Sequence, residues 1–252
     1  MSALPGDFWD TLPLGHGVRL LNRDANGLAA FDKPHGVLSH PNGSEDEPRA
    51  LLTCHYDKEV QCFSWKAADG TERRLWLLNR LDSATSGVIL TASNEKVAKA
   101  VREHYAKKQV QKIYQALVFG KPQQPQEFWR DLISVKKGRG QIRTSTIGNV
   151  PAETRFQLVK HTQKSFSTSL IRLEPRTGRS HQLRVQCAKR HLPIIGDQTY
   201  GDFGLNRSFA KVNKTKRLFL HSLETSFTYD FAGKACAFKA SAPLPPEFTA
   251  GY

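Results

Sequence analysis

The segment Leu77–Leu90 reads Leu-Leu-Asn-Arg-Leu-Asp-Ser-Ala-Thr-Ser-Gly-Val-Ile-Leu, an Arg-x-Asp pair and a small-residue turn between two apolar runs. If residues 75–81 form a strand, side chains two apart share a face, so Arg80 and Asp82 point the same way. A carboxylate beside a fixed positive charge stays ionised and can act as a nucleophile. The alternative is a surface ion pair at the end of a strand. The segment alone does not separate the two.

The charge of the chain favours a polyanionic partner. Its 252 residues include 37 Lys and Arg against 23 Asp and Glu, a net charge of +14, and the hydrophobic content of 39% indicates a globular protein. Nucleic acid is the commonest partner of such a protein, and attraction to a membrane surface is the alternative, which no amphipathic basic helix supports. Basic residues cluster at 107–112, 130–143, 172–190 and 207–217, a pattern typical of contact with a phosphate backbone.

Metals, cofactors and disulfides have no support in the sequence. The four cysteines are scattered without a Cys-x-x-Cys pair, and His181, His191 and Cys187 fit no common zinc spacing. The glycine-rich loops of nucleotide-binding proteins are missing from the sequence, so we expect neither cofactor nor metal. The first residues resemble no signal peptide, and no apolar run has spanning length, so we expect a cytoplasmic protein.

Strand patterns dominate the chain. We expect an extended lead-in to about residue 25, a helix opening at 50–54, a hairpin turn at 68–70 and a helix after Asn94. Further on, we expect a strand over 112–119, hairpins or loops over 123–148, paired strands at 156–159 and 167–173, and a helix from Ser180 to Lys189. The absence of regular β-α-β alternation predicts an α+β fold with a mixed, largely antiparallel sheet and flanking helices.

Two segments besides Arg80–Asp82 carry candidate chemistry. Residues 176–184, Arg-Thr-Gly-Arg-Ser-His-Gln-Leu-Arg, offer helix amides and arginines for a phosphate, and Arg184 could pair with a buried carboxylate. The alternative is an ordinary cationic helix. Tyr114, on an alternating strand, either packs in the core, stacks on a base or exchanges a proton. Asp82 and Asp197 could also be the paired carboxylates of a glycosidase or nuclease, although no second acidic motif accompanies them.

The chain resembles the RluA-type RNA pseudouridine synthases at five places in the same order. Residues 79–87 resemble that family's H-R-L-D-x-x-T-S-G motif, and Lys112-Ile113-Tyr114 resembles its second motif. Residues 176–184, followed by 193–197 and Tyr200-Gly201, resemble its third. Residues 32–36 match its opening Lys-Pro-x-Gly turn, and Leu220-His221 its closing segment. The resemblance covers about residues 28 to 248.

Two positions depart from the family pattern. Asn79 stands where the family usually has His, and Ser222 where it usually has Ala. The resemblance implies an N-terminal extension over 1–27 and a pseudouridine synthase catalytic domain with a central cleft over 28–252. We expect a member without an S4-type RNA-binding domain.

The resemblance also implies the activity and the site. The reaction is isomerisation of specific uridines to pseudouridine in structured RNA, tRNA or rRNA, after the target base is flipped out. Asp82, Tyr114 and Arg184 are then the catalytic residues. The resemblance implies that Asp82 acts as nucleophile or as base at the sugar, and that Arg184 pairs with Asp82 and keeps it ionised and oriented. Substrate-binding residues follow from the same motifs: Arg80, Leu183, Arg179, His181 and Thr85.

Two other classes of function stay open. A catalytically inactive RNA-binding protein could keep the synthase fold, and a glycosidase could use Asp82 on a small substrate. The intact Asp, Tyr and Arg set argues against the first, and the basic composition argues against the second. We expect a monomer that acts on RNA without a cofactor, a protein partner or a membrane.

Overall fold

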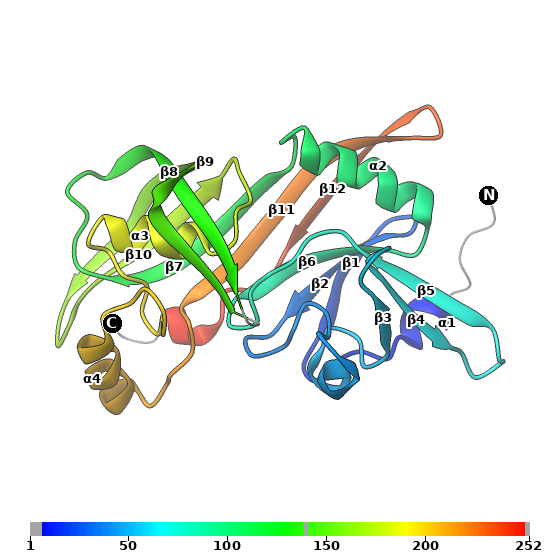
Figure 1. Cartoon of the computed structure of the whole chain (residues 1–252), viewed down its shortest axis with the longest axis horizontal. Coiled ribbons are helices and arrows are strands. Elements are labelled where there is room, and N and C mark those ends of the chain that lie inside the picture. Colours follow the sequence, from blue (N-terminus) through cyan, green and yellow to red (C-terminus); the bar gives the residue numbers. More distant parts are fainter. Residues whose placement is uncertain (1–6, 139–140, 250–252) are drawn as a thin grey trace. The chain divides into compact units, whose positions relative to one another are not determined.

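The computed structural model describes residues 7–138 and 141–249, apart from the side chains of 7, 135–138, 141–143, 146 and 147 (Figure 1). The chain forms two compact units, each of which is described by itself. Unit 1 comprises Met1–Val110 and Glu224–Ala242, and unit 2 comprises Gln111–Leu223 and Pro243–Tyr252. Strand β11 (Leu220–Phe231) contributes residues to both.

Unit 1 is built on antiparallel strands. Their hydrogen-bonded order is β3-β4-β5-β6-β2-β1, and the eight-residue strand β12 pairs with β11. The bounds are β1 (Arg19–Arg23), β2 (Leu28–Lys33), β3 (His55–Asp57), β4 (Cys62–Lys66), β5 (Glu72–Leu77), β6 (Ser86–Ala92) and β12 (Lys234–Ser241). Strands β2 and β6 are buried along their whole length, so they form the centre of this unit.

The core of unit 1 lies beneath helix α2 (Glu95–Ala106). Val97 and Val101 of this helix are fully buried and belong to one apolar cluster with residues of β2, β6, β11 and β12. Asn94 caps the helix by accepting a hydrogen bond from the backbone of Lys96. Two shorter helices, α1 (Asp7–Asp10) and the 3₁₀ helix η1 (Ser44–Arg49), complete the unit.

Unit 2 is a four-stranded antiparallel sheet in the order β7-β10-β9-β8, with helices beside it. The strands are β7 (Gln111–Phe119), β8 (Gln126–Gly138), β9 (Gln141–Gln163) and β10 (Ser167–Pro175). Helix α3 (Gln182–Lys189) packs on β8 and β9, and α4 (Phe203–Asn213) and the 3₁₀ helix η2 (Pro246–Phe248) follow (Figure 1). Phe119, Phe209, Phe219 and Phe248 form an aromatic core.

Most of the predicted elements are present. The hairpin turn at 68–70 joins β4 to β5, the helix after Asn94 is α2, and the strand over 112–119 is β7. The region 123–148 lies in the long β8–β9 hairpin, and the strands expected at 156–159 and 167–173 pair as parts of β9 and β10. Strand β12 and helix α4 were not predicted.

The expected strand over residues 75–81 is wrong beyond Leu77. The amide of Leu90 on β6 donates to Oδ1 of Asn79 at 2.7 Å, so a side chain replaces the backbone acceptor at this point of the sheet. The backbone from Leu78 to Asp82 therefore leaves the strand conformation. The argument that Arg80 and Asp82 share a strand face does not apply, since neither lies on a strand.

Three smaller expectations also differ from the structure. Residues 50–54 form isolated bridges instead of a helix. Helix α3 begins at Gln182, after His181 in the left-handed conformation (φ 53°), and not with a cap at Ser180. Residues 7–25 are more than an extended lead-in, because Trp9 is buried and β1 pairs with β2. The expected domain boundary before Leu28 thus falls inside a β-hairpin.

Gly196 offers a test of close backbone packing in unit 2. Its φ is +77°, and a Cβ there would overlap the carbonyl oxygen of Arg217. We expect Gly196→Ala to lower the free energy of unfolding by about 3 kcal/mol or more in urea denaturation. Gly70 has a similar φ of +80° but no atom within 4 Å of the added Cβ, so Gly70→Ala should cost only about 1 kcal/mol. Equal losses would show that the close approach is unimportant.

Candidate active site

Asp82 lies in a tight turn between β5 and β6. Its carbonyl oxygen accepts a hydrogen bond from the amide of Thr85 at 2.9 Å, which closes the turn. The Asp82 side chain is partly exposed, Arg80 is exposed and Thr85 is buried. The sequence therefore places a reachable carboxylate and a reachable guanidinium two residues apart on a loop.

A buried lysine holds this turn. Lys33, at the end of β2, has no exposed surface, and its Nζ donates to the carbonyl oxygens of Val37 at 2.7 Å, Pro34 at 3.0 Å and Ser83 at 3.1 Å. The Ser83 carbonyl also accepts from the amide of Gly36 at 2.7 Å. A buried ammonium is tolerated only when its protons are satisfied, so these bonds fix the residue that follows Asp82.

Side chains also fix the residues before Asp82. The hydroxyl of Ser39 donates to the Leu81 carbonyl at 2.7 Å and accepts from the Leu81 amide at 2.9 Å. Asn79 accepts from Leu90, as described above. Both flanks of Asp82 are thus bonded to unit 1 through buried or partly buried groups.

Arg80 lies near a stacked pair of rings. His40 and Tyr56 stack with centroids 4.7 Å apart and planes at 12°. Burial lowers the pKa of His40, and the positive charge of Arg80 lowers it further. Burial raises the pKa of Tyr56 to about 12, which the charge of Arg80 opposes. Both shifts favour the neutral form of these two rings.

In unit 2 a buried ion pair joins α3 to the segment that follows it. Arg184 donates from Nε and Nη2 to the two carboxylate oxygens of Asp197, both at 2.8 Å, and from Nη2 to Oγ1 of Thr199 at 3.2 Å. Burial raises the pKa of Asp197, but the bonds and charge of Arg184 more than offset this, so the pKa lies below its usual range. The amides of Thr199 and Tyr200 also donate to Asp197.

Tyr200 connects three parts of unit 2. The Arg184 guanidinium lies 5.2 Å from the centroid of its ring. Its hydroxyl accepts from the amide of Thr144 on β9 at 2.8 Å and lies 2.9 Å from Nδ1 of His181. His181, predicted to bind substrate, thus contacts a side chain that also supports Arg184.

Gln182 organises the turn before α3. Its Oε1 accepts from Thr177 at 2.7 Å and from the amide of Arg179 at 3.1 Å, and its Nε2 donates to the Glu153 carbonyl and to Thr154 on β9. The Arg179 side chain is exposed and its Nε donates to the Pro151 carbonyl at 3.4 Å. The predicted residue Leu183 is buried in α3.

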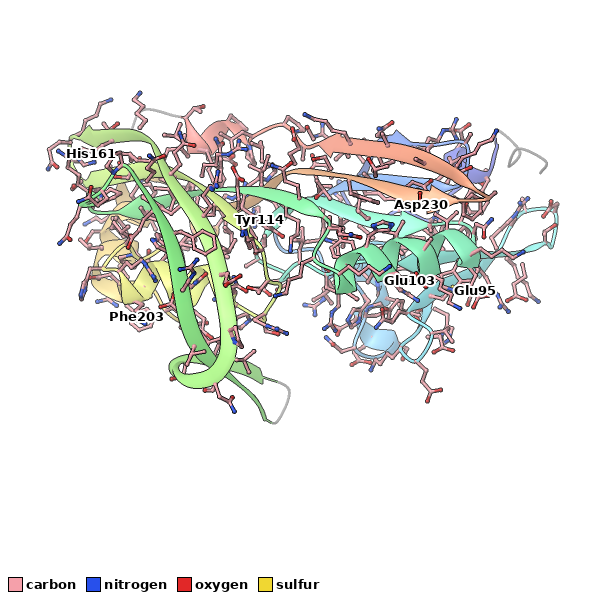
Figure 2. The ribbon with its side chains drawn as sticks, turned by 90° about the horizontal axis from the view of Figure 1, so that it is seen from above. Glu95, Glu103, Tyr114, His161, Phe203 and Asp230 are labelled. Atoms are coloured by element: carbon pink, nitrogen blue, oxygen red, sulfur yellow. The ribbon has the colours of Figure 1, made fainter. Side chains whose placement is uncertain are left out.

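Tyr114 and Lys112 lie on β7, two residues apart (Figure 2). Tyr114 is partly exposed and pairs in register with Leu173 of β10. Burial lowers the pKa of Lys112 to about 8, and its Nζ lies 3.9 Å from the position of a Cβ on Gly178. Lys112 belongs to the second motif and the segment 176–184 to the third. The two motifs lie in separate elements, but Lys112 borders this segment.

The predicted site residues divide between the units. Arg80, Asp82 and Thr85 lie in unit 1, and Tyr114, Arg179, His181, Leu183 and Arg184 lie in unit 2. The structure brings His181, Arg184, Asp197 and Tyr200 together. The pairing of Arg184 with Asp82 and the shared cleft join residues of different units and stay predictions.

Five contributors received no role from the sequence: Lys33, Ser39, Lys112, Gln182 and Tyr200. All except Ser39 lie inside the segments of family resemblance, and that resemblance was the signal that could have identified them. In the described part of the chain, no group of three or more His, Cys, Asp or Glu side chains could hold a metal ion. None of the helices described there is long and apolar enough to cross a membrane.

Comparisons with known proteins identify the family. The model of the RNA pseudouridylate synthase family matches residues 27–189. The chain is 32% identical over 213 residues to tRNA pseudouridine synthase C of Pasteurella multocida, covering 80% of this chain and 82% of that protein. It is 29% identical over 241 residues to ribosomal large subunit pseudouridine synthase C of Buchnera aphidicola, covering 94% and 71%.

A solved structure, the human RNA pseudouridylate synthase domain containing 1, superposes with a TM-score of 0.66 at 20% identity, over 91% of this chain and 85% of that one. This likeness confirms the predicted α+β fold. The chain belongs to the RNA pseudouridylate synthase family, whose enzymes isomerise uridine in RNA, so the predicted family and reaction are confirmed.

The Arg184–Asp197 pair should be essential for the stability of unit 2. Asp197→Ala leaves a buried guanidinium without its counter-charge, so we expect a loss of roughly 3–5 kcal/mol in the free energy of unfolding. The matched control is Glu72→Ala, which breaks the exposed Arg74–Glu72 pair at 2.9 Å and should cost less than about 1 kcal/mol. Urea denaturation measures both, and similar losses would contradict a structural role for the buried pair.

Lys112 should make stability depend on pH. Its pKa is about 8 in the folded protein, below the 10.5 of a free lysine, so the unfolded chain holds this proton more tightly. The contribution of Lys112 to the free energy of unfolding should therefore rise between these pH values, by roughly 2 kcal/mol after allowance for partial exposure. Subtracting the free energy of unfolding of the Lys112→Met variant from that of the wild type at each pH isolates this rise. The exposed Lys121→Met variant should keep the wild-type dependence.

Proposed function

We propose that this chain converts specific uridines of a structured RNA, a tRNA or rRNA, to pseudouridine with Asp82 as its catalytic carboxylate. The observation that carries the proposal is the Arg80-Leu81-Asp82 turn, which lies inside the family match and presents a partly exposed carboxylate on a firmly bonded loop. The named relatives act on tRNA and on the large ribosomal subunit. These names support RNA of either kind as the substrate.

The chemistry requires no external reactant. The bond between N1 of uracil and C1′ of ribose breaks, the base rotates, and a bond from C5 to C1′ forms. The proton on C5 leaves, and one is taken up at N1, so atoms balance without oxidant or group donor. Asp82 acts on the sugar, either as a nucleophile at C1′ or as a base, and both routes agree with its place on the loop.

The residues of unit 2 complete the proposed mechanism. Tyr114 stacks on the target base and assists removal of the C5 proton, and Leu183 packs beneath the ring. Arg184 orients Asp82 with the part of its guanidinium that Asp197 does not use. The bonds from Nε and Nη2 to Asp197 hold the guanidinium plane in one orientation, which favours such a role. Arg179 and His181 contact the RNA near the start of α3.

The rigidity of the Asp82 turn supports catalysis by positioning. Lys33, Ser39 and Asn79 each fix the backbone within three residues of Asp82. A catalytic group whose geometry is fixed before the substrate binds loses little entropy in the reaction. Exposed Arg80 is suited to fill the space of the flipped base or to hold its phosphate, and Thr85 supports the turn beneath it.

The proposed enzyme works in the cytoplasm as a monomer, without a cofactor, a protein partner or a membrane. An inactive RNA-binding protein is the alternative, and it would lack turnover while keeping RNA affinity. A glycosidase with Asp82 and Asp197 as its carboxylates is disfavoured. Asp197 is 1% exposed and accepts bonds from the Arg184 side chain and two backbone amides, which leaves it unsuited to bind a substrate.

Loss of the Asp82 carboxylate should abolish turnover without abolishing RNA binding. We expect Asp82→Asn to reduce tritium release from RNA carrying 5-tritiated uridine by at least about 10⁴-fold, since a neutral amide replaces the proposed nucleophile or base. Pseudouridine mapping in total RNA from cells with and without the gene identifies the RNA and the uridine to use in this assay.

The matched control is Asp230→Asn, an exposed carboxylate of β11 labelled in Figure 2, which should leave tritium release unchanged. Near-normal turnover by Asp82→Asn would remove Asp82 from the mechanism. Wild-type protein that binds RNA but forms no pseudouridine at any mapped site would support the inactive alternative.

A further inference from the structure

The outward face of the β8–β9 hairpin carries a cluster of arginines around one aromatic ring. Phe128 and Arg130 lie two residues apart on β8, so their side chains share a face, and Arg155 of β9 lies directly opposite Phe128 in the register. Arg176 joins them from the turn after β10, where its amide donates to the Glu153 carbonyl at 3.0 Å. We call Phe128, Arg130, Arg155 and Arg176 the arginine cluster.

The cluster lines an open depression of about 460 Å³. The guanidinium groups of Arg130 and Arg176 lie 4.9 and 5.1 Å from the centroid of the Phe128 ring. Contact with a ring face restricts the rotation of a guanidinium group, so part of the entropy cost of binding is already met before a ligand arrives.

Two carboxylates lie near the cluster in the register, Glu153 opposite Arg130 and Glu174 opposite Arg155. No ion pair within the part of the chain that the structure describes joins an arginine of the cluster to a carboxylate. The one acidic residue in the lining, Glu127, accepts a hydrogen bond from Nε1 of Trp129 at 2.9 Å. Three guanidinium groups held close together repel one another, and an anion between them relieves that repulsion.

The opposite face of the hairpin is occupied. Trp129 is 1% exposed, stacks on Phe156 and lies under Arg190 of the α3 terminus. Asp131 binds Lys189 and Arg190 at 2.7 and 2.9 Å. Alternate residues of β8 thus support α3, while the residues between them face solvent with the arginines.

We propose that the arginine cluster binds a backbone phosphate of the RNA substrate, outside the nucleotide that is modified. The paired N–H groups of an arginine guanidinium match the oxygens of a phosphate. A solvent-facing site on a sheet suits an RNA strand that passes over the surface. This inference rests on the proposed function, since it takes RNA as the substrate. A small phosphorylated molecule offers the same chemistry, and the test separates the two.

The test compares variants with equal loss of charge. Arg130→Gln/Arg155→Gln removes two charges from the cluster, and Lys160→Gln/Lys164→Gln removes two from the far end of β9 and the turn that follows it. Binding of a fluorescein-labelled tRNA transcript is measured by anisotropy at several KCl concentrations. We expect the cluster variant to bind about 30-fold more weakly. The plot of log affinity against log salt should become less steep, with the magnitude of its negative slope smaller by roughly 1.4–1.8. The lysine control should change both much less.

Two further variants test the fork geometry. Arg130→Lys/Arg155→Lys keeps the charge, so it should keep the salt slope but lose about fivefold in affinity, because a lysine contacts phosphate as a point charge. Phe128→Leu should lose about threefold with an unchanged slope, since only the support of the guanidinium groups is removed. Thermal melting confirms that each variant is folded.

Three results overturn the proposal: wild-type affinity in the Arg→Gln variant, a loss no greater than that of the lysine control, or micromolar binding of inorganic phosphate or ATP with RNA affinity unaffected. Binding needs no turnover, so tritium release from the same proteins reports the proposed function separately. If wild-type protein forms no pseudouridine, the proposed function fails while the binding comparison still decides the phosphate site.

Discussion

A buried charge held by hydrogen bonds to fixed acceptors is the constraint on which each unit depends. In unit 2 it is the Arg184 guanidinium bound to Asp197, and in unit 1 it is the Lys33 ammonium bound to three carbonyl oxygens. Removing such a charge from water costs several kcal/mol, so the surrounding backbone must keep its acceptors in place. Lys33 is the last residue of β2 and Arg184 lies in the first turn of α3, and both thereby fix irregular chain that no sheet or helix would hold.

The two candidate segments are built in the same way. The Asp82 turn is fixed by side chains of Lys33, Ser39 and Asn79, and the start of α3 by side chains of Gln182 and Tyr200. Loops supply reachable groups but have few backbone bonds of their own. Side-chain bonds to the backbone give these loops the order that catalysis requires, without enclosing the reactive groups in a sheet.

The sequence was informative where apolar periodicity or a complete motif was present. Val97 and Val101 at helical spacing predicted α2, and the alternation from Lys112 to Phe119 predicted β7. It was misleading at residues 78–82, because nothing in the local pattern shows that the Asn79 side chain takes a backbone bond from Leu90. From the residues alone, the partner of Arg184 could be predicted only as a buried carboxylate, since the fold decides that Asp197, thirteen residues away, lies in the right place. The motifs identified the candidate residues, but not the residues that hold them.

The residues on the two faces of strand β8 can change independently of each other in evolution. Trp129 and Asp131 contact residues at the end of helix α3, whereas Phe128 and Arg130 alternate with them and contact each other. Mutations at the even-numbered positions can therefore accumulate without disturbing the helix that carries Arg184. A single inserted or deleted residue would exchange the two sets. Diversification within this strand should thus proceed by substitution, with its length held constant across descendants.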